Sequence, residues 1–279
     1  MSRLNEILKY TKELFPSPEY ETYMRGGIVV KDKNNKTCTR FMIYGTTMDI
    51  EEIEKCEQMT GTASLSKLLE IYKKFQLTSI DLHDAAQIHG ENCSFTVYLM
   101  QILSTGNSWY NKHGFISDEY EKELLNNSSL LDFTVRDFVE QYMKRINVSQ
   151  TSKLQEFMEE KFIKNRFGVS LSEKNLVMDE INRIPEFLDR SIKDVTREII
   201  STYMKNGIIN CTGIPILRWF TFLLIIAQQL VLYKRDLTYN PHEKEEIERK
   251  IQGPKTGGKR KKKTAIRKTR KHKTRKRII

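Results

Sequence analysis

The last 25 residues of the chain, Lys255 to Ile279, contain 14 lysines and arginines and no aspartate or glutamate. Closely spaced like charges repel one another, and this segment has almost no apolar surface to bury, so we expect it to stay disordered outside any core. The whole chain carries a formal net charge of +11, so the remainder, without these 14 charges, carries −3. The fold therefore has to come from a slightly acidic body that carries a basic tail.

A tail of this kind favours polyanions. Each cation that neutralises a phosphate releases a counterion, so binding to nucleic acid should fall steeply as salt rises. The tail has no aromatic residue for base stacking, so sequence-specific recognition is not expected. A solubilising or nuclear-address role and adhesion to an anionic membrane remain alternatives. The residues expected to contact the polyanion are Lys259, Arg260, Lys261, Lys262, Lys263, Arg267, Lys268, Arg270, Lys271, Lys273, Arg275, Lys276 and Arg277.

The four cysteines, Cys38, Cys56, Cys93 and Cys211, are far apart in the sequence and form no Cys-x-x-Cys motif. The N-terminus shows no secretory leader pattern. Together these features predict free thiols in a reducing, intracellular compartment, either the cytoplasm or the nucleus.

One apolar segment, Ile214–Tyr233, is long enough to be considered as a single membrane span. Its uninterrupted apolar stretch, Trp219–Ala227, is only nine residues long, and Arg218, Gln228 and Gln229 flank it. A buried core helix is therefore the expected structure, and no firm membrane association is predicted.

Hydrophobic periodicity predicts an α/β (α+β) domain over residues 1–125, a mostly α-helical domain over 126–252 and a disordered basic tail over 253–279. In the first region we expect helices at Ser2–Phe15, Ala63–Phe75 and Ser94–Leu103 and strands at Gly27–Lys31, Thr37–Tyr44, Asp49–Lys55 and Thr78–His83. In the second region we expect a bundle of about five helices, Leu130–Ile146, Lys153–Arg166, Ser172–Leu188, Asp194–Lys205 and Leu217–Tyr233, followed by a charged helix at His242–Ile251.

The turn between the third strand and the second helix, Gln58–Ala63, contains Gly61 among small residues. Small side chains let a ligand approach the backbone, and free N–H groups in a first helical turn favour a phosphate or pyrophosphate. Many strand-to-helix turns contain glycine for geometry alone, so the alternative is a purely structural turn.

Two motifs together resemble the GNAT acetyltransferase superfamily. Gln58-x-x-Gly61-x-Ala63 is similar to the acetyl-coenzyme A loop of that family, and Tyr110-Asn-Lys-His-Gly114-Phe115 is similar to its Tyr-x-x-x-Gly-Phe segment. The resemblance covers about residues 25–120. It implies that acetyl-CoA binds through Gln58, Thr60, Gly61, Thr62 and Ala63, and that Tyr110 protonates the departing thiolate. The alternative is that Trp109, Tyr110 and Phe115 fill a core around a turn.

An acyl transfer to an amine also needs a base. Glu51, Glu52 and Glu54 lie on the expected third strand, but their spacing does not single one out. A cleft at Gly61, where this strand separates from Thr78–His83, would favour an acyltransferase, whereas a filled cleft would favour an inert scaffold. Five residues of types that can bind zinc lie within 13 positions: Asp81, His83, Asp84, His89 and Cys93. Their spacing matches no specific zinc motif, so no metal is expected.

A second resemblance concerns the wider sequence. The stretches Ser79–Ala85 and Ile102–Asn111, together with the basic tail, look like a group of proteins from giant nucleocytoplasmic DNA viruses (mimivirus-like). This resemblance implies a viral protein in infected cells or in the virion and brings no activity with it. Two hypotheses follow: a GNAT-like N-acyltransferase, possibly degenerate, tethered to polyanions, or a non-enzymatic scaffold associated with nucleic acid. The acceptor substrate and the oligomeric state are left open.

Overall fold

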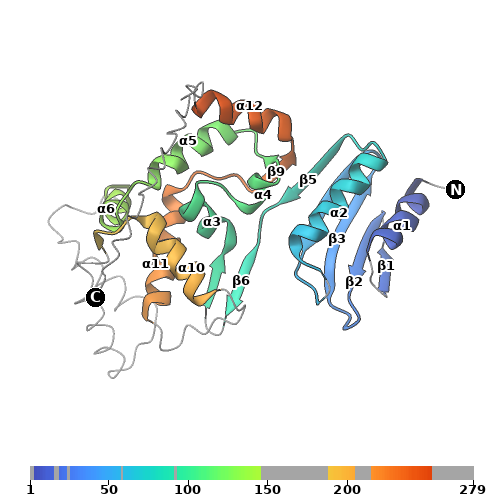
Figure 1. The fold of residues 1–279 in the computed structure, drawn as a ribbon, viewed down its shortest axis with the longest axis horizontal. Helices are drawn as coiled ribbons and strands as arrows, with labels where there is room; N and C mark the ends of the chain where they lie inside the picture. Colours follow the sequence, from blue (N-terminus) through green and yellow to red (C-terminus); the bar gives the residue numbers. More distant parts are fainter. Residues whose placement is uncertain are drawn as a thin grey trace, which may run out of the picture.

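A computed structural model of the chain describes residues 3–15, 19–23, 26–57, 59–90, 93–145, 188–204 and 215–252 (Figure 1). Within these residues the protein is a mixed α/β structure, as the periodicity predicts. The helices expected at Lys153–Arg166 and Ser172–Leu188, apart from the last residue of the latter, and the whole basic tail lie outside the described residues.

The centre of the fold is a seven-stranded sheet with the order β1-β2-β3-β4-β5-β9-β8. The strands are β1 (Glu19–Tyr23), β2 (Gly27–Lys31), β3 (Thr37–Tyr44), β4 (Thr47–Ile53), β5 (Ser79–His83), β8 (Phe115–Ile116) and β9 (Asp236–Tyr239). Neighbouring strands are antiparallel except β4 and β5, which run parallel. A parallel pair needs a crossover connection, and α2 (Gly61–Lys74) provides it.

One face of the sheet is covered by α1 (Arg3–Leu14) and α2. Apolar residues spaced three or four apart on these helices, such as Ile7 in α1 and Leu65 and Leu68 in α2, are almost completely buried. They share one core with Phe41 of β3 and Ile50 of β4. Figure 1 shows both helices beside strands β1 to β3. This packing fixes the position of the first turn of α2 relative to β4.

A second core lies among α3 (Val97–Thr105), α6 (Val135–Arg145), α10 (Ile192–Tyr203) and α11 (Pro215–Leu230). Phe138, Ile192, Phe220 and Leu223 are fully buried there. The apolar segment considered as a membrane span is thus mostly α11, and most of its described apolar side chains pack in this core, as expected. In the part of the chain that is described, no helix has the length and apolar character to cross a bilayer.

Smaller elements complete the structure. They are the hairpin of β6 (Gln87–Gly90) and β7 (Cys93–Thr96), the single turn α4 (Trp109–Lys112), α5 (Tyr120–Leu130) and α12 (Pro241–Gln252). Figure 1 places α12 beside α5, and Ile247 packs against Tyr120 and Leu124 in a third, small core. The helix expected to start at Ser94 starts at Val97, because residues 93–96 pair with β6.

Sheet strand β9 lies far beyond residue 125, where the first region was expected to end. It pairs with β5 through Leu82↔Leu237 and with β8 through Ile116↔Thr238. Leu237 is 1% exposed and belongs to the core under α1 and α2. The sheet therefore draws on both regions of the sequence.

Candidate functional site

Strands β4 and β5 pair over only part of their length. The register runs from Thr47↔Ser79 to Ile50↔Leu82, whereas β4 continues to Ile53. Strand β5 ends at His83, and its other edge pairs with β9 at Asp81, Leu82 and His83. The pairing of the two parallel strands therefore stops at Ile50, three residues before β4 ends.

A cavity of about 360 Å³ lies where the pairing of β4 with β5 stops. Its walls come from the free end of β4, from the end of β5 and the segment that leads into β6, and from α4. The lining residues are Ile50, Glu51, Glu52, Ile53, Glu54, His83, Ala85, Ala86, Gln87, His89 and Tyr110. The volume falls in the usual range of small-ligand pockets.

Tyr110 is held in this wall by its short helix. Ser108 and Asn111 form a reciprocal capping box, in which the Ser108 hydroxyl accepts the Asn111 N–H at 3.1 Å. The Tyr110 ring makes edge contacts with Trp109 and Phe115. Burial, and to a lesser degree the carboxylate of Asp84, raises the pKa of the Tyr110 phenol. The phenol is therefore protonated at neutral pH, as a proton donor must be.

The backbone conformation and the packing at position 114 of the same motif explain why this residue is a glycine. Its φ is +93°, and a Cβ added there would lie 3.1 Å from Pro241 and 3.1 Å from Tyr239. Both the backbone conformation and the close approach of β9 and α12 favour glycine. This glycine lets Phe115 start β8 against β9 and keeps α4 in place.

The expected cofactor loop adjoins Ile53, a residue of the cavity wall, but none of its described residues lines the cavity. Thr60 caps α2, and its hydroxyl accepts the N–H of Ala63 at 3.2 Å. A Cβ at Gly61 would lie 3.6 Å from Ile53 Cγ2 and 4.0 Å from Trp109, so Gly61 sits beside the cavity wall. These are ordinary contacts, so the space around Gly61 does not exclude alanine. Gln58 lies outside the described residues, and Thr62 is exposed at the first turn.

The carboxylates on β4 are not equivalent. Glu52 lies across from Arg40 on β3, with a 3.5 Å ion pair. Burial, followed by a hydrogen bond with the Glu54 carboxyl, raises the pKa of Glu52, and Arg40 partly opposes this shift. A carboxylate with a raised pKa that lines the cavity has the character of a general base, so Glu52 is the candidate for this role.

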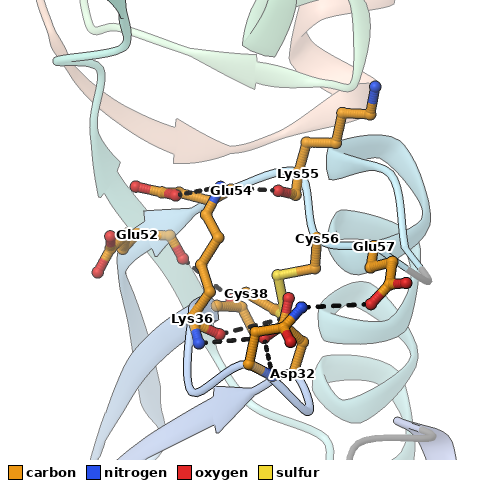
Figure 2. Close-up of a disulfide and its surroundings, with 10 residues drawn as sticks. Asp32, Lys36, Cys38, Glu52, Glu54, Lys55, Cys56 and Glu57 are labelled. Atoms are coloured by element: carbon orange, nitrogen blue, oxygen red, sulfur yellow. Dashed lines mark hydrogen bonds and ion pairs between the residues drawn. A yellow bond between two sulfur atoms is a disulfide. The ribbon is translucent and has the colours of Figure 1, made fainter.

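The turn that precedes α2 contains a disulfide, so the prediction of four free thiols was wrong. Cys38 at the start of β3 and Cys56 before α2 are bonded, with a Cα–Cα distance of 5.5 Å (Figure 2). The antiparallel pairing of β3 with β4 brings these residues together, although 18 positions separate them. Cys56 and Met59 then form a backbone bridge around position 58.

Asp32 lies beside this disulfide, as Figure 2 shows. Its carboxylate, 6% exposed, accepts the backbone N–H groups of Asn34 at 2.9 Å and Lys36 at 3.0 Å. Asp32, Cys38 and Cys56 have possible ligand atoms within 4.8 Å of one another, but the disulfide uses both sulfurs. The carboxylate therefore organises the β2–β3 turn.

Three of the five residues considered as zinc ligands form hydrogen bonds with other side chains. His83 bonds to Asp236 at 2.8 Å, Asp84 accepts the Tyr233 hydroxyl at 2.7 Å, and Asp81 accepts the Thr238 hydroxyl at 2.7 Å. Asp84 is 2% exposed, and its role is to connect the end of β5 to the segment before β9. These contacts account for the carboxylates structurally.

The chain matches no protein-family model, and neither a curated protein nor a solved structure is found to be similar to it. A functional interpretation therefore depends on the geometry of the site.

Proposed function

We propose that this protein is a GNAT-like N-acyltransferase that transfers an acetyl group from acetyl-CoA to an amine. The observation that carries the proposal is a cavity lined by Tyr110 and Glu52, which lies where the pairing of β4 with β5 stops after Ile50. The expected acid, Tyr110, lines this cavity, and Gly61 of the expected coenzyme loop, 49 residues earlier in the sequence, lies next to the lining residue Ile53.

The first turn of α2 fits a pyrophosphate. The N–H of Ala63 is used by the Thr60 cap, and the N–H of Ser64 bonds to the Thr60 carbonyl at 3.0 Å. The N–H groups of Gly61 and Thr62 have no hydrogen bond to any described residue, and the helix dipole adds positive potential there.

The free end of β4 fits an extended amide chain. At Glu52 and Ile53, the side of β4 that faces β5 pairs with no strand among the described residues, while the other side pairs with β3 through Glu52↔Arg40 and Ile53↔Thr39. Backbone groups at a strand edge can bond to amides of a ligand, as in strand addition. The pantetheine arm would then lie along Glu52 and Ile53.

Two side chains would move the protons of the reaction. Acetyl-CoA supplies a thioester whose carbonyl carbon the amine attacks. Glu52 accepts a proton from the amine, directly or through one water, and its raised pKa makes it a stronger base than an ordinary carboxylate. Tyr110 donates its phenol proton to the sulfur as the carbon–sulfur bond breaks. The proposed base and the proposed acid both line this cavity.

A thermal shift titration tests the proposal. At an acetyl-CoA concentration 100 times Kd, binding stabilises the protein by about 2.7 kcal/mol, or roughly 5–10 °C in Tm for a chain of this size. Release of the coenzyme thiol is followed with spermidine and with polylysine as amines. Absence of any Tm shift at millimolar acetyl-CoA would refute the proposal.

Variants separate binding from chemistry. Tyr110→Phe should lower turnover while leaving the acetyl-CoA-induced Tm shift intact. Tyr44→Phe is the matched control, because Tyr44 is 46% exposed at the end of β3 and lies outside the cavity lining. Equal turnover in both variants would remove Tyr110 from the mechanism.

A second candidate is a non-enzymatic scaffold that binds nucleic acid, and the charge of the tail favours it. Deleting residues 255–279 should abolish binding to duplex DNA at low salt. Binding that survives this deletion would refute a tail-mediated role. If acetyl-CoA gives no Tm shift and the tail still binds DNA, the scaffold is the better description.

A further inference from the structure

The face of the sheet opposite to α1 and α2 is acidic. On β4 and β5, Met48, Ile50, Ile80 and Leu82 point into the core, so the alternating residues Asp49 and Asp81 point to the other side. A cavity of about 860 Å³ is found there. Its lining contains five carboxylates and two basic residues: Asp49, Asp81, Asp118, Asp236 and Glu243, and Lys234 and His83.

Asp49 and Asp81 are direct neighbours on the paired strands. The carboxylate of Asp81 accepts hydrogen bonds from two hydroxyl groups, those of Thr238 at 2.7 Å and Ser79 at 3.2 Å. Asp49 makes no hydrogen bond or ion pair with any residue that the structure describes, and burial together with Glu51 and Asp81 raises its pKa. Adjacent like charges without a cation destabilise a sheet. Two carboxylates held in this way indicate a surface that receives a cation.

A second acidic cavity of about 780 Å³ continues the first along α12. Both cavities share Ser117, Asp118 and Glu243, and the second adds Glu119, Glu121 and Glu246. The two linings together contain eight carboxylates and three lysines, and each lysine is paired with a carboxylate of these linings: Lys234 with Asp118, Lys122 with Glu119 and Lys250 with Glu246. We call this surface, from Asp49 to Glu246, the acidic track.

The basic tail starts where the acidic track ends. Helix α12 has 12 residues, so it is about 18 Å long. The cluster Lys259–Lys263 follows Gln252 by 7 to 11 residues, which an extended chain spans with about 23–36 Å. A tail that folds back from Gln252 along α12 therefore brings this cluster to Glu243 and the first cavity.

We propose that the acidic track is the intramolecular docking surface of the basic tail, with Lys259–Lys263 in the cavity at Asp49, Asp81 and Glu243. The opposite charges match, and a short tether gives the tail an effective concentration in the millimolar range at this surface. The docked tail competes with polyanions for the same lysines, so the body controls how readily the tail binds nucleic acid. This proposal does not depend on the acyltransferase activity.

Zero-length cross-linking of the full-length protein tests the docking directly. A carbodiimide joins a lysine amine to a carboxylate only when the two are in contact. At low salt we expect amide links from Lys259–Lys263 to Asp49, Asp81 or Glu243 within monomers, and we expect these links to disappear in 0.5 M NaCl. Links spread evenly over surface carboxylates, or links found only in cross-linked dimers, would overturn the proposal.

DNA affinity provides a second, independent measurement. If about 90% of the tail is docked, the triple variant Asp49→Asn/Asp81→Asn/Glu243→Gln should bind a short duplex about tenfold more tightly at low salt. The control Asp132→Asn/Asp189→Asn/Glu198→Gln changes the net charge equally at exposed positions outside the acidic track. An equal gain in both variants, or no gain in either, would overturn the proposal. Spermidine that binds the full-length protein in the cavity without releasing the tail would assign the cavity to a small polyamine instead.

Discussion

Removing the Cys38–Cys56 disulfide should destabilise the protein measurably. The two cysteines are 18 residues apart, and in the chain-entropy treatment a cross-link that closes a loop of this length contributes about 3 kcal/mol through the unfolded state. Both sulfurs are buried, with exposed fractions of 2% for Cys38 and 5% for Cys56. The variant Cys38→Ser/Cys56→Ser should therefore lose about 3 kcal/mol of unfolding free energy, with a further loss from placing hydroxyls at buried positions.

Urea denaturation followed by circular dichroism measures this loss. For a chain of this size, 3 kcal/mol corresponds to a decrease in Tm of roughly 6–12 °C. Wild-type protein treated with a reducing agent should move toward the variant, whereas the reducing agent should leave the variant itself unchanged. Cys93→Ser/Cys211→Ser serves as the matched control, because it removes two cysteines and keeps the bond between Cys38 and Cys56.

A thiol count gives the clearest refutation. Wild-type protein unfolded without a reducing agent should expose at most two titratable thiols, because Cys38 and Cys56 are bonded to each other. Four titratable thiols would refute the disulfide, and equal stability of wild type and Cys38→Ser/Cys56→Ser would refute the entropy argument. Since Cys56 also forms the turn before α2, loss of the bond should raise the KM for acetyl-CoA if the proposed function holds.

Three further changes test individual contacts. Thr60→Ala should lower the unfolding free energy by about 1 kcal/mol because the cap of α2 is lost, whereas Thr60→Ser should preserve it; urea denaturation measures both. Tyr233→Phe should cost about 1–3 kcal/mol, since the buried carboxylate of Asp84 loses its 2.7 Å bond, and a cost within error of zero would contradict this. The fold raises the pKa of Asp49, so ionisation of Asp49 opposes folding. The stability of wild type relative to Asp49→Asn should therefore be highest below the unfolded pKa of about 4 and decrease as pH rises through the folded pKa, as denaturation over a pH series would show.

Segments with strong local signals were predicted well. Apolar spacing in Ser2–Phe15 and Ala63–Phe75 corresponds to α1 and α2, and the strands at Gly27–Lys31 and Thr37–Tyr44 coincide with β2 and β3. Strand β9 was not predicted. It has four residues and only Leu237 is buried, so its pattern carries little information, and its partners β5 and β8 are more than 100 residues away.

The candidate motifs of the site could be predicted from the sequence, but the contacts between distant residues could not. The motif around Tyr110 and the loop at Gly61 could be read from residue types; Tyr110 lines the cavity, and Gly61 lies next to Ile53, which also lines it. The choice of Glu52 among three glutamates depends on a register shift in β3 after Arg40, which places Arg40 across from Glu52. The disulfide was missed because only the β3–β4 pairing brings Cys38 close to Cys56. Long-range pairing decided each of these outcomes.

The neighbours of Glu52 allow its role as the base to be tested by shifts of opposite sign. The Glu54 carboxyl raises the pKa of Glu52, and the Arg40 guanidinium lowers it. Glu54→Gln should therefore move the acidic limb of the pH–rate profile to lower pH, because a repelling charge is removed. Arg40→Met should move the same limb to higher pH, since a favourable cation is lost.

Glu52→Gln should abolish this limb and reduce turnover, with the acetyl-CoA-induced Tm shift retained. A variant that only disturbed the strand would lower activity at every pH without moving the limb. If Glu54→Gln and Arg40→Met shift the profile in the same direction, or if neither shifts it, then Glu52 does not carry the titration and the base is another group. The opposite signs thus separate a proton acceptor on β4 from a residue that only shapes the cavity.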